Sequence, residues 1–191
     1  IKLFDLMAPG TSQSDWLVAA FFGTIYPSKH LLDALIWLQN FCLQKQKLLL
    51  ITSLGYSPMA PSLFSDLTLR LPSNESLFFH FTGKLESNTL STWIGNADFG
   101  LSTTPFNIID KSGSALAFRE HGIPVIVMDK GVPLRGLTYE MPDLSPEVWM
   151  FGDERLLNVS TLPTRRTPYS RISRVTTQFL LDLGYSTDVN T

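Results

Sequence analysis

Short runs of apolar residues alternate along this chain with stretches in which apolar residues recur every three or four positions. The runs predict strands near 18–23, 48–52, 77–82, 98–103 and 123–128. The helical spacing predicts helices over 29–44, 87–96 and 111–121. Strands without polar interruption are typical of sheets covered on both faces, and strands that alternate with helices build parallel sheets. We therefore expect an α/β fold: a Rossmann-like, doubly wound, mostly parallel sheet of five or six strands with helices on both faces.

Two internal segments have weaker patterns. Residues 58–71 fit a helix, but the alternation of Leu67, Leu69 and Leu71 also fits a strand. Prolines and glycines predict irregular loops over 129–167, with one short helix near 145–150.

The two ends of the chain differ in pattern. Residues 1–15 mix apolar residues with Pro, Gly and Ser, which is typical of a linker or a trimmed lead-in. Helical spacing returns over 165–184, where Gly184 is expected to end a closing helix. The length fits one domain, so we expect a single domain with the Rossmann-like fold over 16–191.

The segment 99–128 organises the predicted sheet, because it contains two strands and the helix between them. Asp110 or Ser112 can accept hydrogen bonds from the free amides at the start of this helix. Gly122 supplies the left-handed conformation that ends a helix. His121 before it either complements the helix dipole or forms an acid–base pair with Glu120, and the first role is typical of a residue at this place.

The start of this helix is also a candidate anion site, because free amides and the positive end of the dipole favour an anion there. Lys111 adds a cation, and Ser112 and Ser114 add hydroxyl groups. Gly113 has no side chain to hold a phosphate away from the backbone. Lys29 stands in a similar place, at the first turn of the first predicted helix. Ordinary capping also explains the serines and the glycine, so both interpretations stay open.

Ligands of doubly wound sheets bind outside the carboxyl ends of the strands. The predicted strand ends are small or polar, as such a crevice requires. The candidate residues at these ends are Gly23, Thr24, Thr82, Gly83, Lys84 and Thr104. Loops between strands and helices are polar in most proteins, so this pattern fits both a binding site and an ordinary surface.

Composition and charge exclude several classes of protein. The net charge is −2 and no basic run occurs, so a nucleic-acid partner is not expected. No apolar run approaches the ~20 residues of a transmembrane helix. The single cysteine, Cys42, cannot form an internal disulfide and fits a reducing compartment, so we expect a cytoplasmic protein. Cys42 and three scattered histidines do not predict a metal site.

Several pieces of the chain, taken in order, resemble a known family. They are residues 23–29 (GTIYPSK), 82–83 (TG), 97–98 (AD), 102–105 (STTP) and 121–126 (HGIPVI). Over about residues 20–185 the chain resembles the C-terminal, donor-binding half of glycosyltransferases with two Rossmann-like domains. This is the GT-B type, and the resemblance is to glycosyltransferase family 4.

The resemblance implies a transferase that passes a sugar from a nucleotide-sugar to an unknown acceptor, in polysaccharide or glycoconjugate biosynthesis. It implies no cofactor, because the nucleotide-sugar is the substrate. Members of this type have an N-terminal acceptor-binding domain, and this chain begins at Ile1 without an initiator methionine. We therefore expect that domain to be missing from this sequence, and the isolated domain to be inactive in transfer.

The chain departs from the family pattern at several positions. Lys29 matches the family's phosphate-facing lysine, whereas Thr24 stands where an arginine is usual. Retaining members carry two glutamates, and these places fall on Ile109 and Ala117. Neither residue binds a sugar hydroxyl, so no catalytic residue is assigned, although Lys111 and the helix start beside it can take up the charge of a diphosphate. A non-catalytic nucleotide or nucleotide-sugar binding module that lost the glutamates remains an alternative.

Overall fold

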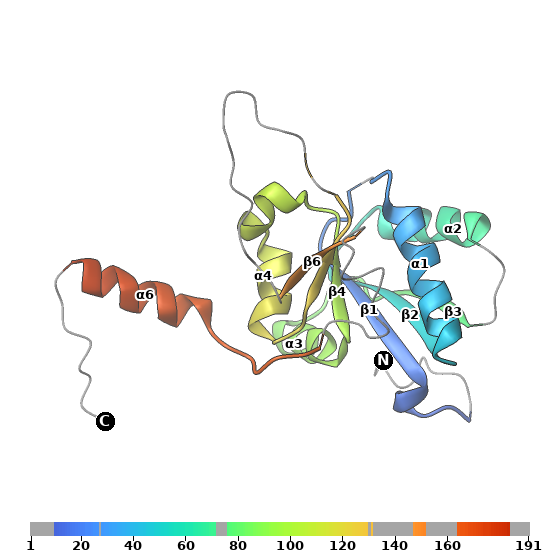
Figure 1. The fold of residues 1–191 in the computed structure, drawn as a ribbon, viewed down its shortest axis with the longest axis horizontal. Coiled ribbons are helices and arrows are strands. Elements are labelled where there is room, and N and C mark those ends of the chain that lie inside the picture. Colours follow the sequence, from blue (N-terminus) through green and yellow to red (C-terminus); the bar gives the residue numbers. More distant parts are fainter. Residues whose placement is uncertain are drawn as a thin grey trace.

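The computed structural model describes residues 10–26, 28–71, 76–129, 131, 147–151 and 164–183. Six strands form one sheet in the order β3-β2-β1-β4-β5-β6, and every neighbouring pair is parallel (Figure 1). They are β1 (Trp16–Phe22), β2 (Leu48–Leu54), β3 (Leu77–Phe81), β4 (Phe99–Ser102), β5 (Val125–Val127) and β6 (Val148–Met150). This confirms the predicted α/β fold class and the five predicted strands.

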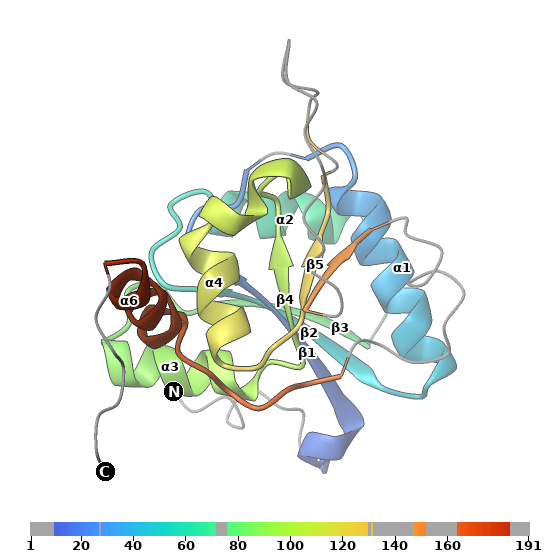
Figure 2. The same cartoon turned by 60° about the vertical axis from the view of Figure 1, so that its left-hand side comes forward.

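Helices cover both faces of the sheet, as Figures 1 and 2 show. The α-helices are α1 (Leu31–Gln44), α2 (Ala60–Arg70), α3 (Ser87–Asn96), α4 (Gly113–Glu120) and α6 (Arg171–Asp182). Short 3₁₀ helices are η2 (Gln13–Asp15) and η3 (Phe106–Lys111). α1 and α2 pack into one apolar core on one face, and α3 and α4 pack into a second core on the other.

β1 lies between the two cores and contributes to both. Leu17, Ala19 and Phe21 belong to the core under α1 and α2. The alternate positions, with Val18 and Ala20 among them, belong to the core under α3 and α4. The uninterrupted apolar run of this strand therefore reflects its burial on both faces.

The ambiguous segment 58–71 contains a helix, and its interpretation as a strand is wrong. Phe64 and Leu67 are buried against the sheet at helical spacing. Leu69, which a strand would place on the same face as Leu67, is 84% exposed. The alternation of leucines here does not mark one buried face, because Leu69 faces solvent.

The prediction of a short helix near 145–150 is also wrong, because residues 148–150 form β6. Val148 pairs with Val125, so this segment extends the sheet as an edge strand beside β5. Most of the predicted loop region 129–167 lies outside the described residues.

The closing helix begins later than the predicted start at 165. Residues 164–170 run alongside the end of α4 without helical structure, and α6 begins at Arg171. The Arg166 amide donates to the Gly122 carbonyl (2.8 Å), and the Tyr169 amide donates to Glu120 (3.0 Å). These bonds and Pro168 favour an extended path over a helix. Gly184, the predicted end, lies outside the described residues.

Two local predictions have different outcomes. Ser28 does not cap α1, because the helix begins at Leu31 after His30, and the Ser28 hydroxyl instead accepts from the His30 amide (3.3 Å). Gly122 does end α4, with a φ of +71°. A side chain there would also collide with the backbone of Arg166, so two constraints require glycine at this position.

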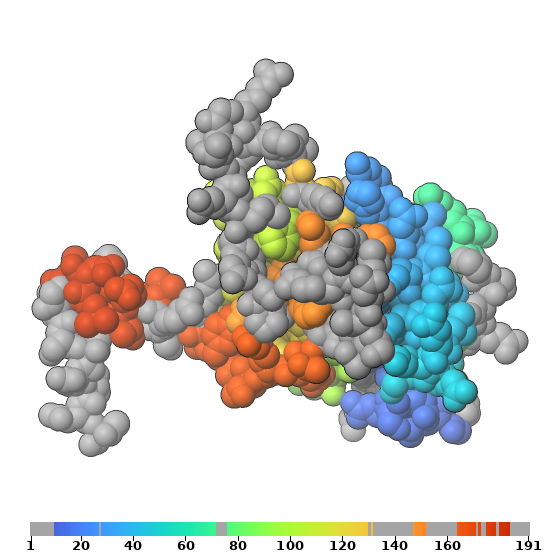
Figure 3. Space-filling model, in the orientation of Figure 1, coloured from blue at the N-terminus to red at the C-terminus, as the bar shows by residue number. Residues whose placement is uncertain are grey.

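α6 lies beside the sheet and its covering helices and projects from them in the space-filling view (Figure 3). Ile172 is 72% exposed and Val175 is 58% exposed. No helix in the described part of the chain combines the length and the apolar character that a membrane-spanning helix needs.

β4 and α4 approach closely at Gly100. A Cβ atom added to Gly100 would lie 2.4 Å from the Phe118 ring, which is fully buried. Gly95 of α3 offers a contrast, because a Cβ atom there would meet nothing within 4 Å. The absent side chain of Gly100 therefore sets how near α4 lies to the sheet.

We predict that Gly100→Ala lowers the free energy of unfolding by about 1–3 kcal/mol, because the methyl group overpacks the core. The matched substitution Gly95→Ala should raise it by about 0.5–1 kcal/mol, because it only removes backbone freedom from a helix. Urea denaturation of both variants checks this. Equal midpoints would contradict the close approach.

An ion-pair network connects α4 to the residue that precedes β6 and to the segment that precedes α6. The buried Arg119 donates to Glu147 (2.7 Å) and to Asp110 (3.1 Å). The Tyr169 hydroxyl also donates to Glu147 (3.0 Å). Burial acts to raise the pKa of Glu147, but the Arg119 hydrogen bond and charge, with help from Tyr169 and Arg166, leave that pKa below its ordinary value.

This lowered pKa predicts a loss of stability in acid. The unfolded chain binds more protons than the folded chain, so the stabilisation is complete above the ordinary pKa of 4.5 and disappears as the pH falls through the lower folded-state pKa. Arg119→Met should cost about 3–5 kcal/mol at neutral pH, since it removes the closest cation from Glu147, which keeps the Tyr169 hydroxyl and the more distant Arg166. It should also flatten the acid dependence.

Thermal unfolding between pH 7 and pH 3 measures both effects. The control is Arg70→Met, which breaks the exposed Arg70–Asp66 pair and should cost less than about 1 kcal/mol. The same acid dependence in wild type and Arg119→Met would contradict the assignment to Glu147.

Candidate ligand-binding pocket

The strand order creates a crevice between β1 and β4. The chain leaves β1 toward β2 on one side and leaves β4 toward β5 on the other, although β1 and β4 are hydrogen-bonded neighbours. The loops after these two strands therefore separate at the carboxyl edge of the sheet. Open α/β sheets bind their ligands at such a point.

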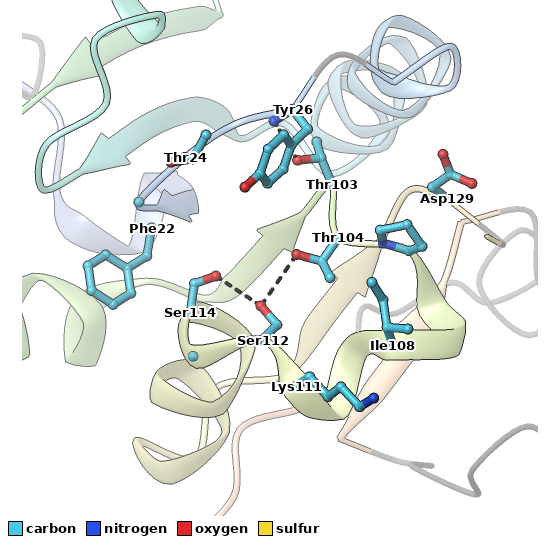
Figure 4. Close-up of a pocket in the computed structure, with 13 residues that line it drawn as sticks. Phe22, Thr24, Tyr26, Thr103, Thr104, Ile108, Lys111, Ser112, Ser114 and Asp129 are labelled. Carbon is cyan, nitrogen blue, oxygen red and sulfur yellow. Dashed lines mark hydrogen bonds between the residues drawn. The ribbon is translucent and has the colours of Figure 1, made fainter. Parts of the chain in front are cut away.

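A pocket of about 930 Å³ lies at this edge. Its walls are the end of β1 and the loop after it, the loop after β4, η3, the first turn of α4 and Asp129 in the loop after β5 (Figure 4). The lining residues are Phe22, Gly23, Thr24, Tyr26, Thr103, Thr104, Pro105, Ile108, Lys111, Ser112, Gly113, Ser114 and Asp129.

The pocket brings together one part of the predicted set of binding residues and leaves out another. The predicted residues that line it are Gly23, Thr24, Thr104, Lys111, Ser112, Gly113 and Ser114. The predicted residues that do not line it are Lys29, Thr82, Gly83 and Lys84. The side chains of Lys29 and Lys84 are exposed elsewhere on the surface.

Hydroxyl groups form a row across the floor of the pocket (Figure 4). Thr104 donates to Ser112 (3.4 Å), and the Ser112 and Ser114 hydroxyls are 3.1 Å apart. Ser112 also caps α4 by accepting from the Ala115 amide (3.3 Å). Ser112 therefore both begins the helix and faces the pocket, so the capping and binding interpretations of this residue are compatible.

The loop after β1 forms the opposite wall. Gly23 adopts a φ of +74° and its amide donates to Leu54 (3.1 Å), which turns the chain out of the strand. Ile25 is buried, and the Tyr26 amide then donates to the Thr103 hydroxyl (2.9 Å). This last bond joins the loops after β1 and β4 across the crevice.

One cation and one carboxylate line the pocket. Lys111 ends η3, and in Figure 4 its ammonium points away from the Ser112 and Ser114 hydroxyls. Asp129 follows β5, and its Oδ1 accepts from the Gly131 amide (2.9 Å), which fixes the carboxylate at the rim. The pocket is therefore close to electrically neutral and rich in hydroxyl groups.

Thr82 and Gly83 hold neighbouring loops together instead of lining the pocket. Gly83 forms an isolated bridge with Gly55, and the Gly55 amide donates to the Thr82 hydroxyl (3.1 Å). These residues follow β3, which lies at the edge of the sheet beyond β2 and away from the switch between β1 and β4. The order of strands in the sheet, which the sequence does not reveal directly, explains why these predicted residues do not line the pocket.

The two positions at which the sequence resemblance places glutamates hold apolar residues that pack inward. Ile109 is 1% exposed, and Ala117 packs against the core under α3 and α4. His121 lies at the far end of α4 from the pocket, with Nδ1 2.8 Å from the Ala117 carbonyl and Nε2 2.7 Å from the Ser91 hydroxyl. Because a carbonyl only accepts, Nδ1 carries the proton, as a capping role requires.

Sequence reasoning missed several lining residues. Asp129 follows β5, so the rule that ligands bind at the carboxyl ends of strands could have found it. Phe22, Tyr26 and Ile108 are apolar or aromatic, and in a sequence such residues are typical of a core. No cluster of three or more possible metal ligands occurs among the residues that the structure describes.

No protein-family model matches this chain, and no curated protein matches it. Solved structures are similar at low identity. The C-terminal domain of a group 1 glycosyl transferase (LpcC) from Francisella tularensis is 12% identical, with a TM-score of 0.44, and the match covers 91% of this chain and 83% of that one. The catalytic domain of starch synthase IV from Arabidopsis thaliana, bound to ADP and acarbose, is 13% identical, with a TM-score of 0.44 and coverage of 80% and 31%.

A UDP-GlcNAc 2-epimerase from Methanocaldococcus jannaschii, in complex with UDP-GlcNAc and UDP, is 15% identical, with a TM-score of 0.45 and coverage of 86% and 46%. This chain thus spans about a third of the starch synthase chain and less than half of the epimerase chain. Glycosyltransferases are among these neighbours, but the similarities are too distant to assign a family or a function to this chain.

Proposed function

We propose that this chain is the donor-binding half of a glycosyltransferase and that the pocket holds the nucleoside diphosphate of a nucleotide-sugar. The observation that carries the proposal is the place of the pocket. It lies at the switch between β1 and β4, and the first turn of α4 forms one of its walls. A longer protein that contains this chain would supply the acceptor-binding domain.

The first turn of α4 suits a diphosphate. Gly113 and Ser114 precede the capped Ala115 amide, in the part of a helix where amides have no intrahelical acceptor. These amides and the helix dipole attract an anion, and the Ser112 and Ser114 hydroxyls can donate to its oxygens. Lys111 is exposed at the rim, and its flexible side chain can turn its ammonium toward the bound charge.

The rest of the pocket suits the uncharged parts of such a ligand. Its volume lies within the roughly 300–1,000 Å³ of small-molecule sites. Tyr26, Phe22 and Ile108 offer apolar surface for the flat faces of a base or a sugar. The fixed Asp129 carboxylate can accept hydrogen bonds from sugar hydroxyls.

The second candidate is a module that binds a nucleotide or nucleotide-sugar without catalysis. The apolar residues Ile109 and Ala117 favour it, because a mechanism based on glutamates at these positions is excluded. Transfer activity in a longer protein that includes this chain would separate the candidates. Binding without transfer by that longer protein would support the module.

A binding screen tests what both candidates share. We expect UDP, ADP or GDP to raise the thermal stability of the chain, since a ligand present at 100 times its dissociation constant adds about 2.7 kcal/mol. We expect no transfer from the isolated chain, because in the proposed function a further domain positions the acceptor. No shift with any nucleoside diphosphate or nucleotide-sugar would contradict the proposal.

We predict that Lys111→Ala weakens nucleoside diphosphate binding by about 1.5–3 kcal/mol, the usual contribution of a hydrogen bond to a charged group. Its folding stability should hardly change, because the residue is exposed. Lys29→Ala and Lys84→Ala are matched controls, since neither residue lines the pocket. Isothermal titration of the four proteins with one nucleotide measures the effect, and equal dissociation constants would refute the role of Lys111.

A further inference from the structure

η3 forms a wall of the pocket but has little structure of its own to hold it there. It brings Ile108 and Lys111 to the lining. A 3₁₀ helix of this length has strained hydrogen bonds, so its position depends on contacts with the rest of the protein. Ile109 is buried in the core, and two polar contacts lie beside the lining residues: the Phe106 amide donates to the Asp129 carbonyl (2.8 Å), and Asp110 pairs with Arg119 (3.1 Å).

Arg119 reaches η3 from the other end of α4. Its side chain is only 8% exposed, and it spans two carboxylates, Asp110 of η3 and Glu147 before β6. A planar guanidinium that donates to two acids has little freedom to move. Asp110 is therefore held against a group that is itself fixed in the protein.

The fixed end of this network continues into the segment 164–170. The Glu147 backbone accepts from Val125 of β5 (2.9 Å), and its carboxylate accepts from the Tyr169 hydroxyl (3.0 Å). The Tyr169 amide in turn donates to Glu120 of α4 (3.0 Å). The pairs thus run from the pocket wall to the stretch of chain that precedes α6.

We propose that Arg119 is a positioning residue for the pocket. Through Asp110 it holds η3, and with it Ile108 and Lys111, at the pocket wall. Through Glu147 it links that wall to the segment 164–170, so a displacement of this segment weakens the hold on η3. Only the identity of the ligand in this inference rests on the proposed function. The mobility of η3 can be measured without a ligand.

The test compares Asp110→Ala with Asp66→Ala, which breaks the exposed Arg70–Asp66 pair, and neither residue of that pair lines the pocket. Hydrogen exchange of the amides of residues 106–112, measured on the ligand-free chain, should speed up in Asp110→Ala and not in Asp66→Ala. The dissociation constant of the tightest binder among UDP, ADP and GDP should rise roughly 3- to 30-fold in Asp110→Ala alone. Asp110→Glu, which keeps a carboxylate, should restore both.

Two further variants examine the rest of the network. Tyr169→Phe removes only the hydroxyl that donates to Glu147, and it should increase exchange in residues 106–112 by a smaller factor. Arg119→Met and the double variant with Asp110→Ala complete a double-mutant cycle, in which the two changes should not add. If Arg119→Met does not fold, Asp110→Ala and Tyr169→Phe still decide the question.

Unchanged exchange at residues 106–112 in Asp110→Ala would overturn the proposal. An increase spread evenly over the whole chain would also overturn it, because it would mean that the pair only contributes to global stability. Faster exchange confined to η3, in a chain whose wild type binds none of the three nucleotides, would support the positioning role and count against the proposed function.

Discussion

The pairing of β1 with β2 on one side and with β4 on the other is the constraint on which the pocket depends. Ala20 illustrates it, because this residue is opposite Thr52 in one neighbour and Gly100 in the other. The chain must leave these paired strands in opposite directions, and the loops after β1 and β4 then separate at the carboxyl edge. The crevice follows from this topology before any side chain is considered.

The position of α4 brings hydroxyl groups and free amides to the crevice. Phe118 packs over Gly100, and this close approach brings the helix down onto β4. Its first turn then lies beside the loop that follows the same strand, where Thr104 meets Ser112. A side chain at Gly100 would push the helix away, and the hydroxyl row and the free amides would move with it. Packing in the core therefore determines the geometry of the polar wall.

The sequence predicted the helix start at Ser112 and the turn at Gly23 because both depend on local backbone chemistry. It also suggested Thr82 and Lys84, which belong to strand ends of the same kind but follow an edge strand. It did not suggest Ile108, because an apolar residue that lines a pocket has the same pattern as one in a core. It could not suggest the Asp110–Arg119 pair, since those residues meet only when η3 folds back beside α4.

The sequence by itself determined the alternation of strands and helices, the parallel sheet and the polar carboxyl edge, because apolar periodicity and capping act over a few neighbouring residues. The tertiary structure alone decided that 60–70 is a helix, that 148–150 adds a sixth strand, and which loops meet. Leu69 is exposed and Val148 is buried although both are apolar. Their environments depend on elements distant in the chain, and a local pattern carries no information about which distant elements will pack together.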